Sequence, residues 1–298
     1  MKVKLIQMTQ NPIDVMWTAA RTCYSAKSPI EMWEDKYGEV SDKCEHTQEW
    51  IEQCTEKHWK LVKTVLDSGH QSVAEHVYFT FAIEGISRAC SHQLVRHRAG
   101  IVFSQQSQRY VEIKESYEKI RDLVISVDPL CEHFNECTCE KEEQELIEIL
   151  NKYFVDVNED NVIGYGQALM HYLRKTDWGE KAEDARNFLP NATKTNITMS
   201  LNYRELIHIC NLRLCTRAQK EIRDLFKEII KCVKEVDERL AFYLVPQCEV
   251  HGICFEDKCC GRKPTIDEIL QNEKTVEELK QRVQDLQNTI EQNAFERE

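Results

Sequence analysis

A run of alternating residues near position 80 places the strongest limit on the fold. Val77, Phe79, Phe81 and Ile83 are apolar, and they alternate with His76, Tyr78, Thr80 and Ala82. A period of two is typical of a strand that buries one face. Trp50, Cys54, Leu61 and Val65 instead keep helical steps of four and seven, which predicts a helix over about 48–68. The chain is therefore expected to be of the α/β (α+β) class, with long helices against a sheet.

Other segments extend this pattern. Lys2–Met8 and the segment ATKTNITMSL before Asn202 are expected to be strands, and residues 162–174 a helix. Ser87 is expected to cap a helix over Arg88–Arg98, on which Gln93, Arg96 and His97 would lie close together. Gly100 would then release the chain into a loop that carries Ser104–Arg109.

The segment Arg88–Tyr110 is basic in a chain that is otherwise acidic. It contains four arginines, whereas the chain as a whole has a net charge of −12 and a pI near 5.4. This overall charge argues against general affinity for nucleic acid or an anionic membrane. Guanidinium groups match phosphate and carboxylate oxygens, so the segment indicates a site for a phosphorylated ligand. A solvated basic face is the alternative.

A second informative stretch begins at Asn202. This residue is expected to be the N-cap of a helix, with Glu205 completing a pattern close to a capping box. Arg213 shares a face of that helix with apolar neighbours, so its guanidinium needs an anionic or carbonyl partner. Both an internal carboxylate and a bound ligand would meet that need.

Fourteen cysteines are expected to be mostly thiols in a reducing cytosol. Cys131, Cys137 and Cys139 lie in an insertion near 127–142 and have irregular spacing, which favours surface thiols. Residues 248–264 form a second Cys-rich segment, in which four further cysteines accompany His251. They could form a zinc knuckle, but paired CxxC spacing is missing, and no metal site is assigned. The cysteines of this second segment are Cys248, Cys254, Cys259 and Cys260.

Residues 265–298 follow the Cys-rich segment and are expected to be a helix of coiled-coil type. Their apolar positions alternate steps of three and four, which is typical of an assembly seam, although the helix could also pack on its own domain. These positions are Val276, Leu279, Val283, Leu286 and Ile290. The remaining part, 1–247, is expected to hold the catalytic and binding groups.

Several common sequence signatures are absent. The chain has no GxxxxGK[ST], no GxGxxG after a strand, no GxSxG and no HExxH. It also has no run of 18 apolar residues and no apolar signal core at its start, which predicts a cytoplasmic protein that does not enter a membrane. A phosphate site in this chain must therefore be built from side chains, chiefly arginines.

The segment RHRAGIVFSQQSQRY resembles the signature of flavin-dependent thymidylate synthases, in which RHR is followed by a spaced Ser and an SxRY ending. The segments GHQSVAEHVYFTF and LNYRELIHICNLRLCTRAQKEI resemble the flanking segments of the same family, in the same order. One departure is that eight residues separate Arg98 from Ser107, where the family pattern has seven. The extra residue is expected to form a bulge within 99–103.

The resemblance implies methylation of dUMP to dTMP, with carbon from methylenetetrahydrofolate and hydride from FAD that NADPH has reduced. It implies a homotetramer with sites shared between subunits, around an antiparallel sheet. The cofactor-binding residues that it implies are His70, Ser72, Glu75, Arg96, His97, Arg98, Gln105, Asn202, Tyr203, Arg204 and His208. The nucleotide-binding residues that it implies are Gln93, Arg96, Gln105, Gln106, Ser107, Gln108, Arg109, Arg186 and Arg213.

Arg213 is the catalytic residue that the resemblance implies, as the group that stabilises the ionised pyrimidine ring. Ser107 is expected to bind the nucleotide by hydrogen bonding, because a Ser nucleophile needs a neighbouring base and none is evident. Another dUMP-binding flavoprotein oxidoreductase remains an alternative. A non-enzymatic module for nucleic acid is a weaker one, because the chain lacks a basic, aromatic platform.

Overall fold

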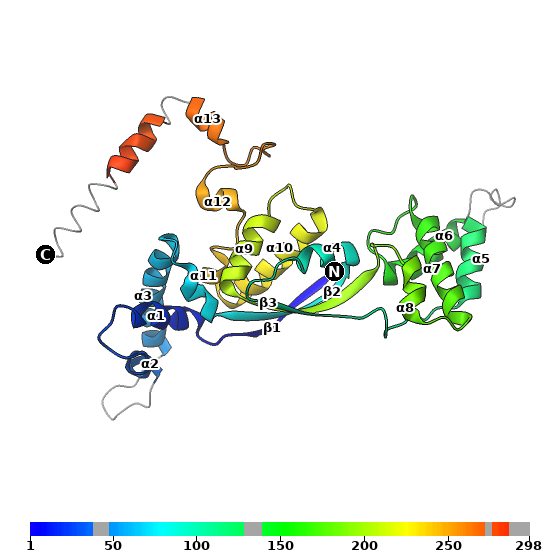
Figure 1. Cartoon of the computed structure of the whole chain (residues 1–298), viewed down its shortest axis with the longest axis horizontal. Helices are drawn as coiled ribbons and strands as arrows, with labels where there is room; N and C mark the ends of the chain where they lie inside the picture. Colours follow the sequence, from blue (N-terminus) through cyan, green and yellow to red (C-terminus); the bar gives the residue numbers. More distant parts are fainter. Residues whose placement is uncertain (38–47, 128–138, 272–275, 286–298) are drawn as a thin grey trace.

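The computed structural model describes residues 1–37, 48–127, 139–271 and 276–285 (Figure 1). At its centre lies a four-stranded antiparallel sheet in the order β1-β2-β4-β3, which confirms the predicted antiparallel sheet. The strands are β1 (Lys2–Met8), β2 (Tyr78–Ser87), β3 (Ile101–Gln105) and β4 (Lys194–Asn202).

The strand β2 owes its central place to the alternation seen in the sequence. Phe79, Phe81 and Ile83 are at most 1% exposed, whereas Tyr78 on the other face is exposed. The strand pairs with β1 on one side and β4 on the other. Each large apolar side chain buried in this way contributes about 1.5–3 kcal/mol, so the alternation fixes which face of the sheet meets the core.

The main core lies between the sheet and a set of helices from both halves of the chain. In α10, the buried residues Ile222, Leu225, Phe226, Ile229 and Val233 repeat with helical spacing and pack towards the sheet. The helices around this core are α1 (Pro12–Thr22), α3 (Gln48–Asp67), η1 (Gln71–His76), α4 (Arg88–Leu94), α9 (Tyr203–Arg213), α10 (Lys220–Val236) and α11 (Glu238–Ala241).

A smaller, separate core lies in a helical bundle at one end of the sheet (Figure 1, right). Its helices are α5 (Tyr117–Val127), α6 (Cys139–Tyr153), α7 (Val162–Asp177) and α8 (Ala182–Ala185), followed by η2 (Arg186–Phe188). The bundle therefore carries Arg186 on a turn that leads back into β4.

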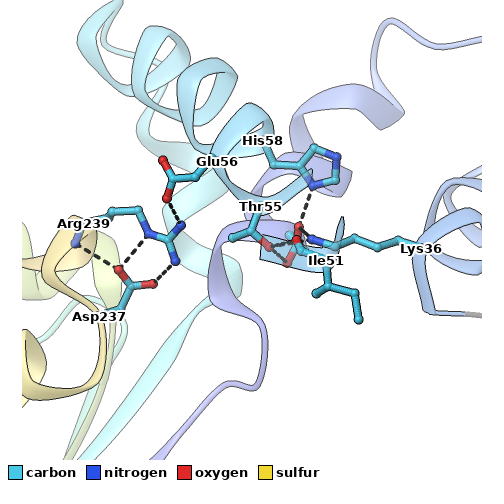
Figure 2. Close-up of polar contacts among 8 residues, drawn as sticks. Lys36, Ile51, Thr55, Glu56, His58, Asp237 and Arg239 are labelled. Carbon is cyan, nitrogen blue, oxygen red and sulfur yellow. Dashed lines mark hydrogen bonds and ion pairs between the residues drawn. The ribbon is translucent and has the colours of Figure 1, made fainter. Parts of the chain in front are cut away.

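A buried carboxylate joins the first three helices, the second of which is α2 (Pro29–Tyr37). Asp14 accepts hydrogen bonds from Lys36 Nζ (2.7 Å) and Tyr37 Oη (2.7 Å), and His58 Nδ1 lies 2.5 Å from it. Burial alone would raise the pKa of Asp14, but the hydrogen bonds from His58, Lys36 and Tyr37 hold it at about 2. Figure 2 shows Lys36 and His58 converging on this point.

A second polar cluster lies beside the first. Arg239 donates to Asp237 Oδ2 (2.8 Å) and to Glu56 Oε1 (2.6 Å), which joins the start of α11 to α3 (Figure 2). These contacts connect α3, in the N-terminal group of helices, to α11 in the C-terminal part of the core.

Two predictions for 88–109 are wrong. The helix ends at Leu94, so Arg96, His97 and Arg98 lie in the turn that follows and not on the helix. The expected loop contains strand β3, which pairs with β4 from Ile101 to Gln105 without a shift of register. The expected bulge is therefore absent from 101–105, because the left-handed Gly100 (φ 63°) makes the turn before the strand begins.

The C-terminal residues lie outside both cores. α12 (Gln247–His251) and α13 (Ile266–Gln271) are short, and residues 276–285 are helical, with Leu279 and Val283 exposed. The remaining seam positions, Leu286 and Ile290, lie outside the described residues, as do Cys131 and Cys137 of the insertion. No helix in the described ranges is both long and apolar enough to cross a bilayer.

Candidate active site

The first two turns of α9 line a cavity of about 590 Å³. The opposite walls come from η1, the start of β2 and the turn before β3. Glu75, Asn202, Arg204 and His208, all predicted to bind the cofactor, line this cavity. The other lining residues, which the sequence did not single out for this purpose, are Gln71, Tyr78, Ala99, Gly100 and Glu205.

Asn202 shapes the mouth of the cavity through its backbone and its side chain. Its Oδ1 accepts a hydrogen bond from Glu205 N (2.8 Å), which confirms the predicted N-cap. Its backbone N–H donates to Gly100 O (2.9 Å), so the reciprocal half of a capping box does not form. A Cβ at position 100 would lie 2.8 Å from Asn202 Cγ. The approach of the two segments therefore requires glycine.

Arg204 and His208 are exposed on the same face of α9, one turn apart. The guanidinium of Arg204 pairs with Glu75 of η1 across the cavity. Since this pair is exposed to solvent, an anionic ligand can compete with Glu75 for the guanidinium.

His97 lies buried between Arg213 and Glu205. Arg213 Nε donates to His97 Nε2 (3.1 Å), and His97 Nδ1 is 3.6 Å from Glu205 Oε1. Burial, with the charges of Arg213 and His208, lowers the pKa of His97 to about 4. The imidazole is therefore neutral near pH 7, with its proton on Nδ1, because Nε2 must accept from Arg213.

This contact leaves the terminal nitrogens of Arg213 available. In the part of the chain that the structure describes, the guanidinium has no carboxylate partner and its one hydrogen bond is through Nε. The internal carboxylate that the sequence left open is thus absent from these residues. A neutral acceptor orients the guanidinium but does not neutralise it, so its charge remains for an anion.

Arg96 and Arg98 flank His97 and are exposed, and neither forms an ion pair within the described ranges. His70 and Ser72 are exposed at the start of η1. Gln93, in the last turn of α4, donates to the side chain of Gln219. Arg96 and Arg98 thus place cationic groups next to the contact between His97 and Arg213.

A second group of predicted residues lies past the other end of β3. Gln106, Ser107 and Gln108 line a cavity of about 430 Å³ together with Lys194 and Asn196 of β4. Ser107 Oγ accepts from the backbone N–H of Arg109 (3.2 Å). No base contacts this hydroxyl in the described residues, which argues against Ser107 as a nucleophile.

Arg109 and Arg186 share one acidic residue. Arg109 Nε donates to Glu183 Oε2 (2.9 Å), and Arg186 Nε donates to Glu183 O (3.0 Å). Burial and the charge of Arg186 lower the pKa of Arg88, which has no ion pair among the described residues. Among the described residues, only Arg109 of these three arginines pairs with a carboxylate, so the charges of Arg88 and Arg186 suit a phosphate. The sequence placed Arg88 in the basic run but gave it no role.

β3 separates the two groups. Five residues at about 3.3 Å each span roughly 15 Å, from Gly100 beside Asn202 to Gln105 before Ser107. Gln105 lies between them and donates to Ser91 Oγ (3.0 Å) and Thr195 Oγ1 (3.2 Å). Two residues predicted to hold one nucleotide therefore lie towards opposite ends of β3: Arg213 contacts His97 before the strand, and Arg109 follows it.

The prediction that the side chain of Tyr203 binds the cofactor is wrong. The residue is fully buried, and its hydroxyl donates to Leu240 O (2.7 Å) while its ring lies beside Phe79. As the first residue of α9, Tyr203 faces the core, and Arg204 next to it faces the cavity. The neighbouring positions in the motif cannot both reach the ligand.

The sequence model of the family described as thymidylate synthase complementing protein matches residues 4–237. The flavin-dependent thymidylate synthase of Clostridium tetani is 36% identical over 270 residues, which are 90% of this chain and 96% of that protein. The enzyme of the same name from Nitratidesulfovibrio vulgaris is 33% identical over 267 residues, 88% of this chain and 95% of that protein.

A solved structure has the same fold. The crystal structure of the flavin-dependent thymidylate synthase ThyX from Helicobacter pylori, complexed with FAD and dUMP, has a TM-score of 0.57 and 24% sequence identity. The match covers 82% of this chain and all of that one.

Proposed function

Because the chain belongs to the flavin-dependent thymidylate synthase family, we propose that it methylates dUMP to dTMP. Methylenetetrahydrofolate supplies the carbon, and NADPH supplies the hydride by way of FAD. The folate then leaves as tetrahydrofolate, because the electrons come from NADPH. We assign this activity to residues 1–247, which include the region that matches the family, 4–237.

The cavity at the start of α9 fits FAD in its chemistry. Arg204 lines it and offers a guanidinium group for a diphosphate, as do Arg96 and Arg98 just before its lining residue Ala99, and Asn202 and His208 offer hydrogen-bonding groups. Its volume of about 590 Å³ is typical of a cofactor pocket. When bound there, FAD supplies the hydride transfer that the side chains cannot perform.

Ser107, Arg109 and Arg186 would hold the nucleotide phosphate, and Gln93, Arg96 and Arg213 would bind the base. The observation that carries the proposal is the guanidinium of Arg213, which a neutral His97 orients through Nε alone. Its terminal nitrogens can stabilise negative charge on a pyrimidine oxygen or nitrogen, which favours attack at the ring carbon.

The separation of the two groups by β3 supports a site shared between subunits. We place the Ser107–Arg109 group of one subunit against the Arg213 group of another, in a homotetramer. In such an assembly each subunit contributes to more than one site, and the isolated chain has no complete site.

Anaerobic absorption spectroscopy tests this function. The protein reconstituted with FAD should lose its oxidised-flavin bands on addition of NADPH, and faster when dUMP is present. Bleaching at the same rate with and without dUMP would indicate a flavoprotein oxidoreductase that does not methylate dUMP. Failure of the protein to bind added FAD would contradict the proposal.

A further inference from the structure

The Cys-rich segment 248–264 packs against the C-terminal end of α9. Arg217 Nε lies 3.7 Å from Glu256 Oε2, and the Cys260 thiol is hydrogen-bonded to Thr216. A small cavity of about 60 Å³ lies at this junction, with Cys215, Cys248, Cys254 and Cys260 among the residues that line it. The segment therefore brings several thiols together beside the helix that ends in Arg213.

One of these thiols, Cys254, is hydrogen-bonded to Cys259, which lies outside the cavity lining. The same short stretch holds both residues in place. Cys254 N donates to Pro264 O (2.8 Å), and Cys259 Sγ donates to Lys263 O (3.1 Å). Gly261 N also donates to Cys259 Sγ (3.3 Å). Because Lys263 and Pro264, which are adjacent in the chain, hold Cys259 and Cys254 respectively, the fold of the segment keeps the two cysteines near each other.

The arrangement suits a pair of thiols better than a metal. In the ranges that the structure describes, no group of three or more His, Cys, Asp or Glu side chains is placed to hold a metal ion. Two thiols that share a hydrogen bond, and that are both held by Lys263–Pro264, lie near one another, as disulfide formation requires. The zinc knuckle that the sequence left open is therefore not formed by these residues.

We propose that Cys254 and Cys259 are a reversible dithiol site for low-molecular-weight disulfides. Cys259 is the more exposed of the two, and Cys254 is 8% exposed. The Cys259 thiolate attacks one sulfur of the external disulfide and expels the first small thiolate. Cys254 then attacks the Cys259 sulfur and expels the second. The protein loses two hydrogens and two electrons, and the disulfide becomes two thiols.

The bond would close the loop that carries Glu256. Glu256 lies between the two cysteines in the chain and is the partner of Arg217. Oxidation therefore fixes the loop in the conformation that lies against α9, and reduction releases that constraint.

Tryptic mapping tests the pairing in the full-length protein. Trypsin gives peptide 240–258, with Cys248 and Cys254, and peptide 259–262, with Cys259 and Cys260. Hydrogen bonds from the Arg262 backbone and Thr216 lower the pKa of the exposed Cys260, which makes that thiol the main competitor. The double variant C248S/C260S removes both competitors and leaves one cysteine in each peptide.

After incubation with oxidised glutathione, the two peptides should be linked in the wild type and in C248S/C260S. Dithiothreitol should separate them. Further substitution of Cys254 by serine should abolish the link, whereas Cys23→Ser, at an exposed thiol after α1, should leave it intact.

Three results would overturn the proposal. The first is linked peptides in the wild type but not in C248S/C260S, which would show that the bond uses Cys248 or Cys260. The second is free thiols at Cys254 and Cys259 after oxidation in excess glutathione disulfide. The third is one bound zinc per chain in the protein as purified, measured by elemental analysis.

Discussion

At the scale of single residues, the site depends on how Arg213 is held. A neighbouring carboxylate would neutralise the charge of a guanidinium. Arg213 instead contacts the neutral imidazole of His97, which leaves its charge in place. Burial raises the pKa of Glu205, the carboxyl nearest to the other ring nitrogen. The Arg213 guanidinium thus keeps its positive charge available for an anion.

Replacement of Arg213 by alanine should lower kcat for dTMP formation by about 10²–10³-fold, the range for loss of one group that stabilises developing charge. FAD content should not change, because the cavity residues Asn202 and Arg204 remain. The matched control is Arg217→Ala, one turn further on and paired with Glu256. Steady-state kinetics on the two variants would contradict the assignment if both kept wild-type kcat.

Sequence reasoning selected Asn202, Arg204 and His208, which line one cavity, because a helix start and a motif marked them. It misassigned Tyr203, because a motif does not say which neighbours face the core. It also missed the role of Arg88 and the contact of His97 with Glu205, which join segments far apart in the chain. Such contacts depend on tertiary packing, which periodicity does not report.

At the scale of elements, the turn before β3 sets the width of the cavity. Gly100 has a φ of 63°, and its carbonyl accepts from Asn202 N. The sequence predicted a loop over 101–105, because the edge strand carries polar Ser104 and Gln105 and is too short for a clear period. Pairing with β4, whose partner residues lie 92 to 100 positions further along the chain, decides the conformation.

Gly100→Ala should destabilise the protein and reduce its flavin content. The left-handed backbone costs about 1–2 kcal/mol for alanine, and displacement of the Asn202 cap costs about 1 kcal/mol more. Gly179→Ala is the control, since its φ of 85° is also left-handed and its Cβ would meet nothing within 4 Å. Equal midpoints of urea unfolding and equal flavin content in the two variants would argue against the contact.

The helical layer at the start of the chain depends on Asp14. Asp14→Asn should lower the free energy of unfolding by roughly 3–5 kcal/mol, because Lys36 would be left buried without its counter-charge. Asp35→Asn, at an exposed pair with Lys27, should cost at most about 1 kcal/mol. Denaturation of both variants in urea measures the difference.

The same carboxylate also makes a prediction for pH. Because the pKa of Asp14 in the folded protein is about 2, below the ordinary value of 3.8, its stabilisation is present above pH 3.8 and is lost as the pH falls towards 2. Urea unfolding of the wild type and of Asp14→Asn between about pH 2 and pH 4 measures this loss. Equal free energies of unfolding for the two proteins over this pH range would contradict the contact.

At the scale of the whole molecule, the predicted site residues form two groups near opposite ends of β3. One holds Arg213, His97 and His208, and the other holds Ser107, Arg109 and Arg186. The sequence indicated shared sites only through the family resemblance, because no pattern in one chain reports where a second copy sits.

Co-expression of Arg109→Ala with Arg213→Ala should restore activity that neither variant has alone. If each site takes Arg213 from one subunit and Arg109 from another, random assembly leaves about a quarter of the sites intact. Tandem affinity tags would isolate the mixed oligomers. Mixed oligomers with no more activity than either parent would place both arginines in a site of one chain.

The most direct test of the central claim is the product of the reaction. The purified protein, with FAD, NADPH, dUMP and methylenetetrahydrofolate, should form dTMP and tetrahydrofolate in equal amounts, as measured by chromatography with mass detection. Omission of FAD or NADPH should stop both. Oxidation of NADPH with dUMP recovered unmethylated would contradict a thymidylate synthase, even if the protein binds flavin and nucleotide.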